Sequence, residues 1–489
     1  MSEASVSEAV VPGAVAVEAP PVRLSWALAL ALWRMDAAAW FLVLALPVCL
    51  YLAVAIPPGQ GLDEPNHFFR VLQLSRGQVL AERSGDKVGG QVPSCVVAYL
   101  SQADRVATSP ITFQWPAFAT PAPVGCDASG TTFVDFPNTV VYSPVSYLPQ
   151  VAGVIAARTA GAPLAWVFLA GRLAGLLAYA GLVFAALRIA PIGRTVILVV
   201  GLMPMALTSA AEYSADGMTL ALALLLVAAV IRCCRDPQAT WRTFAIAAAA
   251  AAGLALCKST YFVLAPLLLV VPGRLFPSRA TSIGARTAAV AAAALAAGGW
   301  YLAVGPGALA HVANGIDPHA QIRYILDHPL RYVRLVTMTV AGPVTPYFTW
   351  PGFVSWVGFT RNAVYGTPAP PILVVVAGFV AIAMAYRTEL AVTLQRSLRT
   401  WVVASWPVIL VVANVVLIIT ALYITDAAVG ASMYWHVHGR YFLPLAAVPA
   451  VSVGVLAARP GQGASALPYA ATMSLLLLYL VGKVAIYFY

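Results

Sequence analysis

Eleven long apolar runs constrain the fold of this chain more than any other feature of its sequence. They lie near residues 37–56, 164–187, 195–210, 215–231, 243–257, 259–273, 287–304, 371–386, 401–424, 441–458 and 466–488. Runs of this length suit helices that cross a bilayer. Since 61% of the residues are hydrophobic and 9% are charged, the sequence predicts an all-α polytopic membrane protein with about 11 transmembrane helices and excludes a large soluble core.

The arginines between these runs predict the topology. They cluster in alternate loops, near residues 188–194, 232–242, 274–286 and 387–399. Cytoplasmic loops carry such an excess of basic residues, so we place these loops and the N-terminus in the cytoplasm. Residues 1–22 then form a disordered cytoplasmic tail, and residues 23–489 form one integral membrane domain. The net charge of +10 follows from loop placement, and we expect no nucleic acid as a partner.

Two segments decide whether the number of spans before each later loop is odd or even, and hence on which side of the membrane that loop lies. Residues 243–273 fit a hairpin with Lys258 at its outer tip, because one broken helix would invert every later loop. Residues 141–157 contain two prolines and precede Arg158. We expect them to form a helix in the outer interface, whereas a twelfth span here would reverse the topology.

Two large outer segments follow from this arrangement, at about residues 57–163 and 305–369. The first contains Cys95 and Cys126, which would pair in an oxidising compartment, although the sequence leaves this open. The second contains an amphipathic stretch from Pro318 to about Met338, which predicts a helix on the membrane surface.

The most unusual charges follow the first span. Asp63 and Glu64 are adjacent acids, and His67 and Arg70 come one helical turn later. Charge near a membrane is costly, so this cluster is a functional-site hypothesis. The alternative is a solvated loop whose acids cap a helix that starts near Asn66. A lone cation lies within the span 164–187, where Arg172 should pair with Glu212 or Asp216 on a neighbouring helix.

The other unusual polar residues also fall on the outer side, where one cavity could collect them. They are Asn138, Tyr142, Glu212, Ser214, Asp216, Lys258, Asp426, His436, His438 and Arg440. Each has a structural alternative: Asn138 and Asp216 are possible helix caps, and Lys258 is a candidate for snorkelling to the interface. Aromatic residues suited to stacking on sugars, or to an interfacial belt, are Tyr142, Tyr147, Trp350, Trp356 and Tyr441.

Carboxylates, cations and aromatic rings in one cavity suit a lipid-linked phosphosugar. Arg440 and Lys258 would neutralise the phosphate as the glycosidic bond breaks. Asp63 or Glu64 would take the proton of the attacking hydroxyl. We expect no cofactor, and the alternative is a divalent metal bound by His436, His438 and Asp426.

Several short segments together carry a family resemblance. They are residues 62–70, 138–144, 147–150, 214–216, 258–261 and 439–444. Over about residues 40–460 the chain resembles a bacterial family of multipass membrane proteins of unknown function, often encoded near surface-polysaccharide genes. That family is similar to the GT-C class of glycosyltransferases, which use polyprenyl-phosphate sugars and place a catalytic acid in the first outer loop. The resemblance implies Asp63, with Glu64, as the catalytic acids, and it implies these substrate-binding residues: His67, Arg70, Asn138, Tyr142, Asp216, Lys258, Arg440 and Tyr441.

The expected function is therefore an inverting glycosyltransferase of the bacterial inner membrane. It would move a sugar from a polyprenyl-phosphate carrier to an envelope glycan, lipid or protein on the outer face. The main alternative is a polysaccharide or lipid transporter, or a polymerase or ligase of the same pathway. A transporter should carry polar features at the bilayer midplane and on both faces, whereas here they gather on one side. The sequence does not identify the sugar or the acceptor.

Overall fold

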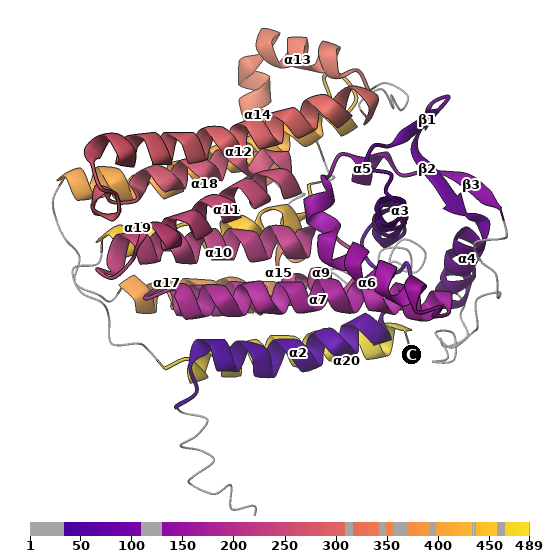
Figure 1. The fold of residues 1–489 in the computed structure, drawn as a ribbon, viewed down its shortest axis with the longest axis horizontal. Coiled ribbons are helices and arrows are strands. Elements are labelled where there is room, and N and C mark those ends of the chain that lie inside the picture. Colours follow the sequence, from indigo (N-terminus) through magenta and orange to yellow (C-terminus); the bar gives the residue numbers. More distant parts are fainter. Residues whose placement is uncertain are drawn as a thin grey trace, which may run out of the picture.

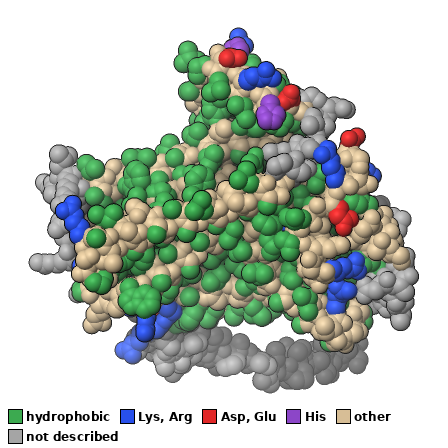
Figure 2. Space-filling model, turned by 45° about the horizontal axis from the view of Figure 1, so that its top comes forward, with side chains coloured by type: hydrophobic (Ala, Val, Ile, Leu, Met, Phe, Trp, Pro, Cys, Tyr) green, Lys and Arg blue, Asp and Glu red, His purple; other side chains and the backbone are tan. Residues whose placement is uncertain are grey.

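Apolar helices lie side by side in one bundle, and a smaller lobe caps one of its ends (Figure 1). The computed structural model describes residues 34–108, 130–308, 316–341, 349–355, 370–390, 398–432, 434, 437–456 and 465–488. On the face shown in Figure 2, hydrophobic side chains cover the bundle and charged side chains gather toward its two ends. This distribution suits a bundle whose sides face lipid.

The elements of the bundle correspond to the predicted runs. They are α2 (Ala37–Ala55), α7 (Leu164–Ile189), α8 (Arg194–Gly201), α9 (Pro204–Ala211), α10 (Asp216–Arg235), α11 (Trp241–Cys257), η4 (Ser259–Val270), α12 (Arg279–Ala308), α17 (Ile372–Leu390), α18 (Leu398–Asp426), α19 (Ala450–Leu456) and α20 (Leu467–Phe488).

By length and composition, eight apolar helical stretches in the described residues can cross a membrane, or nine if the bent pair α8–α9 is one span. Pro204 opens α9 at the 58° bend between the two helices, where proline suits a first helical turn but not a helix interior. The prediction of a multi-pass helical membrane protein is confirmed. The number of 11 spans is not established, since α11 and η4 are shorter than the other candidates.

Helix α10 lies at the centre of the bundle and packs against α7, α11 and α19. Its Leu, Ala and Val side chains are buried on nearly all sides, as expected for a helix that is apolar all round. The residues at the two ends of α10 therefore have fixed positions inside the protein. The first of them is Asp216.

Helices α11 and η4 form a hairpin with Lys258 at its tip, as predicted, while the outer location of this tip stays a prediction. Lys258, between the two elements, bonds Asp216 at the start of α10. At the far end, Arg274 Nη2 donates to the Cys233 carbonyl near the end of α10, at 2.9 Å. The chain therefore runs along α10 in α11 and returns in η4, a 3₁₀ helix that contains Pro266.

Several arginine-bearing segments meet at the end of the bundle opposite the lobe. Arg188, near the end of α7, pairs with Asp36 just before α2, at 2.8 Å. The hydroxyl of Thr195 in α8 donates to Glu389 near the end of α17, at 2.7 Å. The grouping agrees with the alternation of loops that the arginines predict, while the side of the membrane on which they lie remains a prediction.

The lobe is built from most of the first outer segment. It comprises α3 (Glu64–Ser75), β1 (Glu82–Ser84), β2 (Lys87–Pro93), α4 (Ser94–Thr108), β3 (Thr131–Asp135), α5 (Pro137–Val140), η3 (Pro144–Tyr147) and α6 (Leu148–Thr159). The strands form an antiparallel sheet in the order β1-β2-β3, with Glu82 opposite Gly89 and Gly89 opposite Asp135. An all-α description misses this sheet. Cys95 is disulfide-bonded, and Cys126, its expected partner, lies outside the described residues.

Aromatic packing joins the lobe to the bundle. The ring of Phe68 in α3 lies 4.7 Å from that of Phe168 in α7 and 4.8 Å from that of Tyr213, which precedes α10. These side chains are fully buried, and such pairs stabilise beyond their buried area. Helix α3 therefore has a fixed position relative to the first residues of α10.

Two predicted interfacial segments are helical. Helix α6 has 12 residues, fewer than the roughly 20 needed to cross a bilayer, and it packs along α7. The amphipathic stretch that starts at Pro318 forms two helices, α13 (Pro318–Asp327) and α14 (Pro329–Ala341), rather than one. The break falls at His328, the residue before a proline, where helical backbone is disfavoured. The location of these helices at a membrane surface remains a prediction.

Candidate functional site

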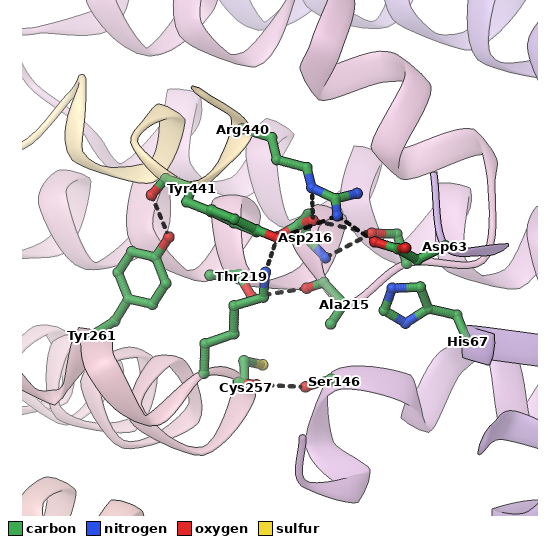
Figure 3. Close-up of polar contacts among 12 residues, drawn as sticks. Asp63, His67, Ser146, Ala215, Asp216, Thr219, Cys257, Tyr261, Arg440 and Tyr441 are labelled. Atoms are coloured by element: carbon green, nitrogen blue, oxygen red, sulfur yellow. Dashed lines mark hydrogen bonds and ion pairs between the residues drawn. The ribbon is translucent and has the colours of Figure 1, made fainter. Parts of the chain in front are cut away.

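Four charged side chains from distant parts of the sequence form an ionic chain at the lobe end of the bundle (Figure 3). Arg440 Nη2 donates to Asp63 Oδ2 at 2.6 Å, and Arg440 Nε lies 3.5 Å from Asp216 Oδ2. Lys258 Nζ donates to Asp216 Oδ1. The order Asp63–Arg440–Asp216–Lys258 alternates negative and positive groups, so each charge has an opposite neighbour.

Asp63 lies at the outer end of this ionic chain. Its backbone has φ 59° and ψ 14°, and it is the only non-glycine residue with positive φ among the described residues. Although it precedes α3, its side chain makes no capping bond, so the capping alternative is wrong for Asp63. Burial raises the pKa of its carboxyl, but the charge of Arg440 and its hydrogen bond act against this, and the pKa lies below its usual value. The side chain is 34% exposed.

Asp216 lies at the centre of the ionic chain. It is the first residue of α10. The residue before it, Ala215, is the N-cap and has no side chain that could bond the helix. Its backbone N–H donates to Ser214 Oγ at 3.0 Å, while its carboxylate faces Lys258 and Arg440. Its role is therefore to hold two cations rather than to cap a helix.

Lys258 lies at the tip of the hairpin and is 7% exposed. Its Nζ lies 5.1 Å from the ring centroid of Tyr142 and 4.7 Å from that of Tyr441. Burial lowers the pKa of Lys258, but the carboxylate of Asp216 outweighs this and raises it above the ordinary value. Lys258 is thus a buried cation between aromatic faces and does not snorkel to the interface.

Arg440 belongs to the short 3₁₀ helix η6 (Gly439–Tyr441) and is 5% exposed. Tyr261 supports this helix, since its hydroxyl donates to the Tyr441 carbonyl at 2.6 Å. Nε and Nη1 of Arg440 are buried and have no hydrogen-bond partner among the described residues. A guanidinium has five N–H donors in a planar fork, so this one keeps donors for a ligand.

His67 forms part of the wall beside Asp63. Its Nδ1 lies 2.7 Å from the Tyr147 hydroxyl, and its ring is parallel to that of Tyr142 with centroids 6.1 Å apart. Burial lowers the pKa of His67 to about 4. The imidazole is therefore neutral at physiological pH.

Glu64 lies outside the ionic chain, although it is next to Asp63 in the sequence. Its buried carboxylate accepts two bonds from Arg172, at 2.6 and 2.7 Å. It also accepts from the backbone N–H groups of Gly59, Gly61 and Tyr213, at 3.0, 3.2 and 3.0 Å. Both oxygens are occupied, so Glu64 anchors the loop before α3 and thereby positions Asp63.

The expected partner of Arg172 was wrong. Arg172 pairs with Glu64 rather than with Glu212 or Asp216, because the loop that follows α2 brings Glu64 over α7. Both oxygens of Glu212 are buried without a hydrogen-bond partner among the described residues. Burial, together with the charge of Glu64, raises the pKa of Glu212 well above its usual value.

The remaining predicted residues lie in the lobe. Arg70 is fully buried and donates to Gln73 Oε1 at 2.5 Å and to the Val79 carbonyl at 2.9 Å. Asn138 is exposed, and its Oδ1 accepts from Asn66 at 2.8 Å. Of the ten predicted site residues, the structure places Glu64, Arg70 and Asn138 apart from the ionic chain and brings these seven together: Asp63, His67, Tyr142, Asp216, Lys258, Arg440 and Tyr441.

The proposed metal ligands do not form a described site. Asp426 accepts a hydrogen bond from the Tyr434 hydroxyl at 2.7 Å, and His436 lies outside the described residues, as does Trp356. Among the residues that the structure describes, no group of three or more His, Cys, Asp or Glu side chains is placed to hold a metal ion. Trp350 packs edge-to-face on Phe379, with centroids 5.5 Å apart.

The sequence analysis did not identify two tyrosines that hold site residues in place. Tyr147 was considered only as a stacking ring, but its hydroxyl contacts His67. Tyr261, three residues after Lys258, holds η6 and hence Arg440. The signals for Tyr261 in the sequence were its proximity to Lys258 and its place in segment 258–261 of the family resemblance.

The helices and the ionic chain together define a class: a multi-pass helical membrane protein with a buried site of alternating charge at one end of its bundle. A family model described as a predicted membrane protein (DUF2142) matches residues 28–448. Because the match covers most of the sequence, the chain belongs to this family. Searches of curated proteins and of solved structures gave no match.

Proposed function

We propose that this protein is a glycosyltransferase that takes a sugar from a polyprenyl-phosphate carrier. It transfers the sugar to an envelope glycan, lipid or protein at the outer face of the bacterial inner membrane. The observation that carries this proposal is the ionic chain, which combines a partly exposed carboxylate with a buried guanidinium that has unused donors.

Arg440 and Lys258 suit the phosphate of the donor. Guanidinium groups bind phosphate oxygens with two parallel hydrogen bonds, and a buried ammonium adds a point charge. Nη1 of Arg440 has no hydrogen-bond partner among the described residues, and Nε has only the long ion pair with Asp216 at 3.5 Å. Charge that grows on the phosphate as the glycosidic bond breaks is best stabilised by donors that are already in place.

Asp63 suits the role of general base. It is the most exposed carboxylate of the ionic chain, at 34% against 8% for Asp216. In the reaction, the acceptor oxygen forms a bond to the anomeric carbon, and the bond from that carbon to the phosphate oxygen breaks. The acceptor proton passes to Asp63, and the leaving polyprenyl phosphate keeps the electron pair beside Arg440 and Lys258. Inversion follows from this single displacement.

A deletion strain tests the proposal without knowledge of the sugar. Mass spectrometry of its surface glycans, lipids and proteins should show the loss of one sugar, and the wild-type gene should restore it. With that donor identified, Asp63→Asn should lower the turnover of the purified protein by about 10²–10⁴-fold, because the amide cannot accept the proton. An unchanged envelope, or full turnover by Asp63→Asn, would contradict the proposal, and loss of activity with a chelator would indicate a metal-assisted transferase.

A further inference from the structure

In this structure the proposed base is tied to the proposed phosphate ligand. We propose that the phosphate of the carrier lipid replaces Asp63 as the partner of Arg440, and that this exchange frees the Asp63 carboxylate to receive the acceptor proton. The inference rests on the proposed function and specifies the order of events at the same site.

Arg440 has the capacity for the exchange. Within the described residues, both hydrogen bonds of the Arg440 guanidinium come from Nη2. They go to Asp63 at 2.6 Å and to the Tyr441 hydroxyl at 3.3 Å. Nη1 is buried without a hydrogen bond to any described residue, which is costly for a charged group, and Nε has only its ion pair with Asp216 at 3.5 Å. Figure 3 shows Arg440 between Asp63 and Asp216. A phosphate that reaches Nη1 satisfies this donor and competes directly with the Asp63 carboxylate on Nη2.

The balance of charge identifies Asp63 as the group that leaves. The two carboxylates and two cations of the ionic chain sum to zero, so a bound phosphate adds at least one negative charge beside two existing ones. Asp216 is held by Lys258 as well as by Arg440. Asp63 has its one described ion pair with Arg440 and is the more exposed of the two acids.

The exchange does not require the backbone to move. Glu64, the next residue, is fixed by Arg172 and by the N–H groups of Gly59 and Gly61. Rotation of the Asp63 side chain is therefore enough to break its contact with Arg440. The anchored backbone keeps the carboxylate beside the phosphate, where the reacting carbon would lie.

The exchange also changes the strength of the base. The nearby charge of Arg440 lowers the pKa of Asp63 against the effect of burial. When Arg440 turns to a phosphate, its attraction is cancelled and a new negative charge lies close by. Both changes raise the pKa of Asp63 toward the range in which general bases work best. Acceptor activation would thus depend on prior binding of the donor.

Carrier affinity in an Asp63 variant tests the exchange. The probe is undecaprenyl phosphate, which is common to donors with any sugar, and its dissociation constant is measured by native mass spectrometry of the purified protein in micelles. Asp63→Asn removes the competing charge, so affinity should rise about fivefold or more, in the range of typical coupling between sites. The matched control is Asp36→Asn, which removes the same charge from the pair with Arg188 at the other end of the bundle and should leave affinity unchanged.

The outcomes separate the exchange from the proposed function. Unchanged or weaker carrier binding by folded Asp63→Asn overturns the exchange, even if that variant is inactive in transfer. Full transfer activity in Asp63→Asn overturns the role of the base and hence the proposed function. If Asp63→Asn does not fold, Asp63→Gly removes the same charge at a residue with positive φ, which glycine accepts. The same rise in affinity is then expected, and its absence overturns the exchange.

Discussion

Replacement of Glu64 by glutamine should destabilise the protein strongly, although the two side chains have the same shape. Oε1 of Glu64 accepts from Arg172 Nε and from Tyr213 N, and Oε2 accepts from Arg172 Nη2, Gly59 N and Gly61 N. An amide nitrogen cannot accept a hydrogen bond. Either orientation of the new amide therefore loses two or three accepted bonds and leaves the charge of Arg172 unpaired.

The expected cost is a large part of the stability of the fold. Hydrogen bonds to charged groups contribute about 1.5–3 kcal/mol each, so two lost bonds alone correspond to about 3–6 kcal/mol. Breaking a buried ion pair by removal of one partner costs a similar amount, about 3–5 kcal/mol. Folded proteins are stable by only about 5–15 kcal/mol, so Glu64→Gln should be close to unfolding.

Unfolding in detergent micelles, followed by tryptophan fluorescence, measures this effect. Glu389→Gln is the matched control, because Glu389 accepts from Thr195 near the opposite end of the bundle and is not part of a buried ion pair within the described residues. It should change stability by no more than about 1 kcal/mol. The double variant Glu64→Gln with Arg172→Met should cost less than the sum of the two single variants, because no unpaired charge remains. Stability of Glu64→Gln within about 1 kcal/mol of wild type would refute the anchoring role.

Three further predictions concern the site and the topology. Arg440→Ala should weaken undecaprenyl phosphate binding by about 1.5–3 kcal/mol, and Arg440→Lys should restore only part of it; equal affinity in the alanine variant would remove Arg440 from the site. His67 has a pKa of about 4 when folded and about 6.5 when unfolded, so the unfolded chain gains the proton first and stability should fall as the pH drops from about 6.5 to 4. The melting temperature of His67→Gln, measured against pH, should fall less than that of the wild type over this range. The same fall in both proteins would contradict the prediction. A membrane-impermeant thiol reagent should label a cysteine at Asp86 in intact cells but not one at Arg235; labelling at position 235 would invert the topology.

The position of the ionic chain was predictable, because it follows from the parity of the spans. Alternating arginine loops place the ends of consecutive helices on fixed sides, so Asp63, Asp216, Lys258 and Arg440 had to share one side. The sequence also predicts that adjacent acids project differently, so that only one of Asp63 and Glu64 faces the site.

The partners of these charges were not predictable, because they depend on contacts between distant segments. Glu64 is held by backbone groups and by a helix more than 100 residues away, and no local pattern encodes that contact. The sheet of the lobe was missed for another reason. Its strands have 3, 7 and 5 residues, too few for clear alternation, and Gly89 and Gly90 interrupt the longest one.

The 3₁₀ conformation of η4 relates the site to the thickness of the membrane. A 3₁₀ helix rises about 2.0 Å per residue, so its 12 residues reach about 24 Å, whereas an α-helix of the same length would reach about 18 Å. Helix α11, with 17 residues, spans about 26 Å. The shorter arm of the hairpin is thus stretched to match the longer one, close to the roughly 30 Å of a bilayer core. The matched lengths of the two arms place Lys258, at the tip of the hairpin, level with Asp216 at the start of α10.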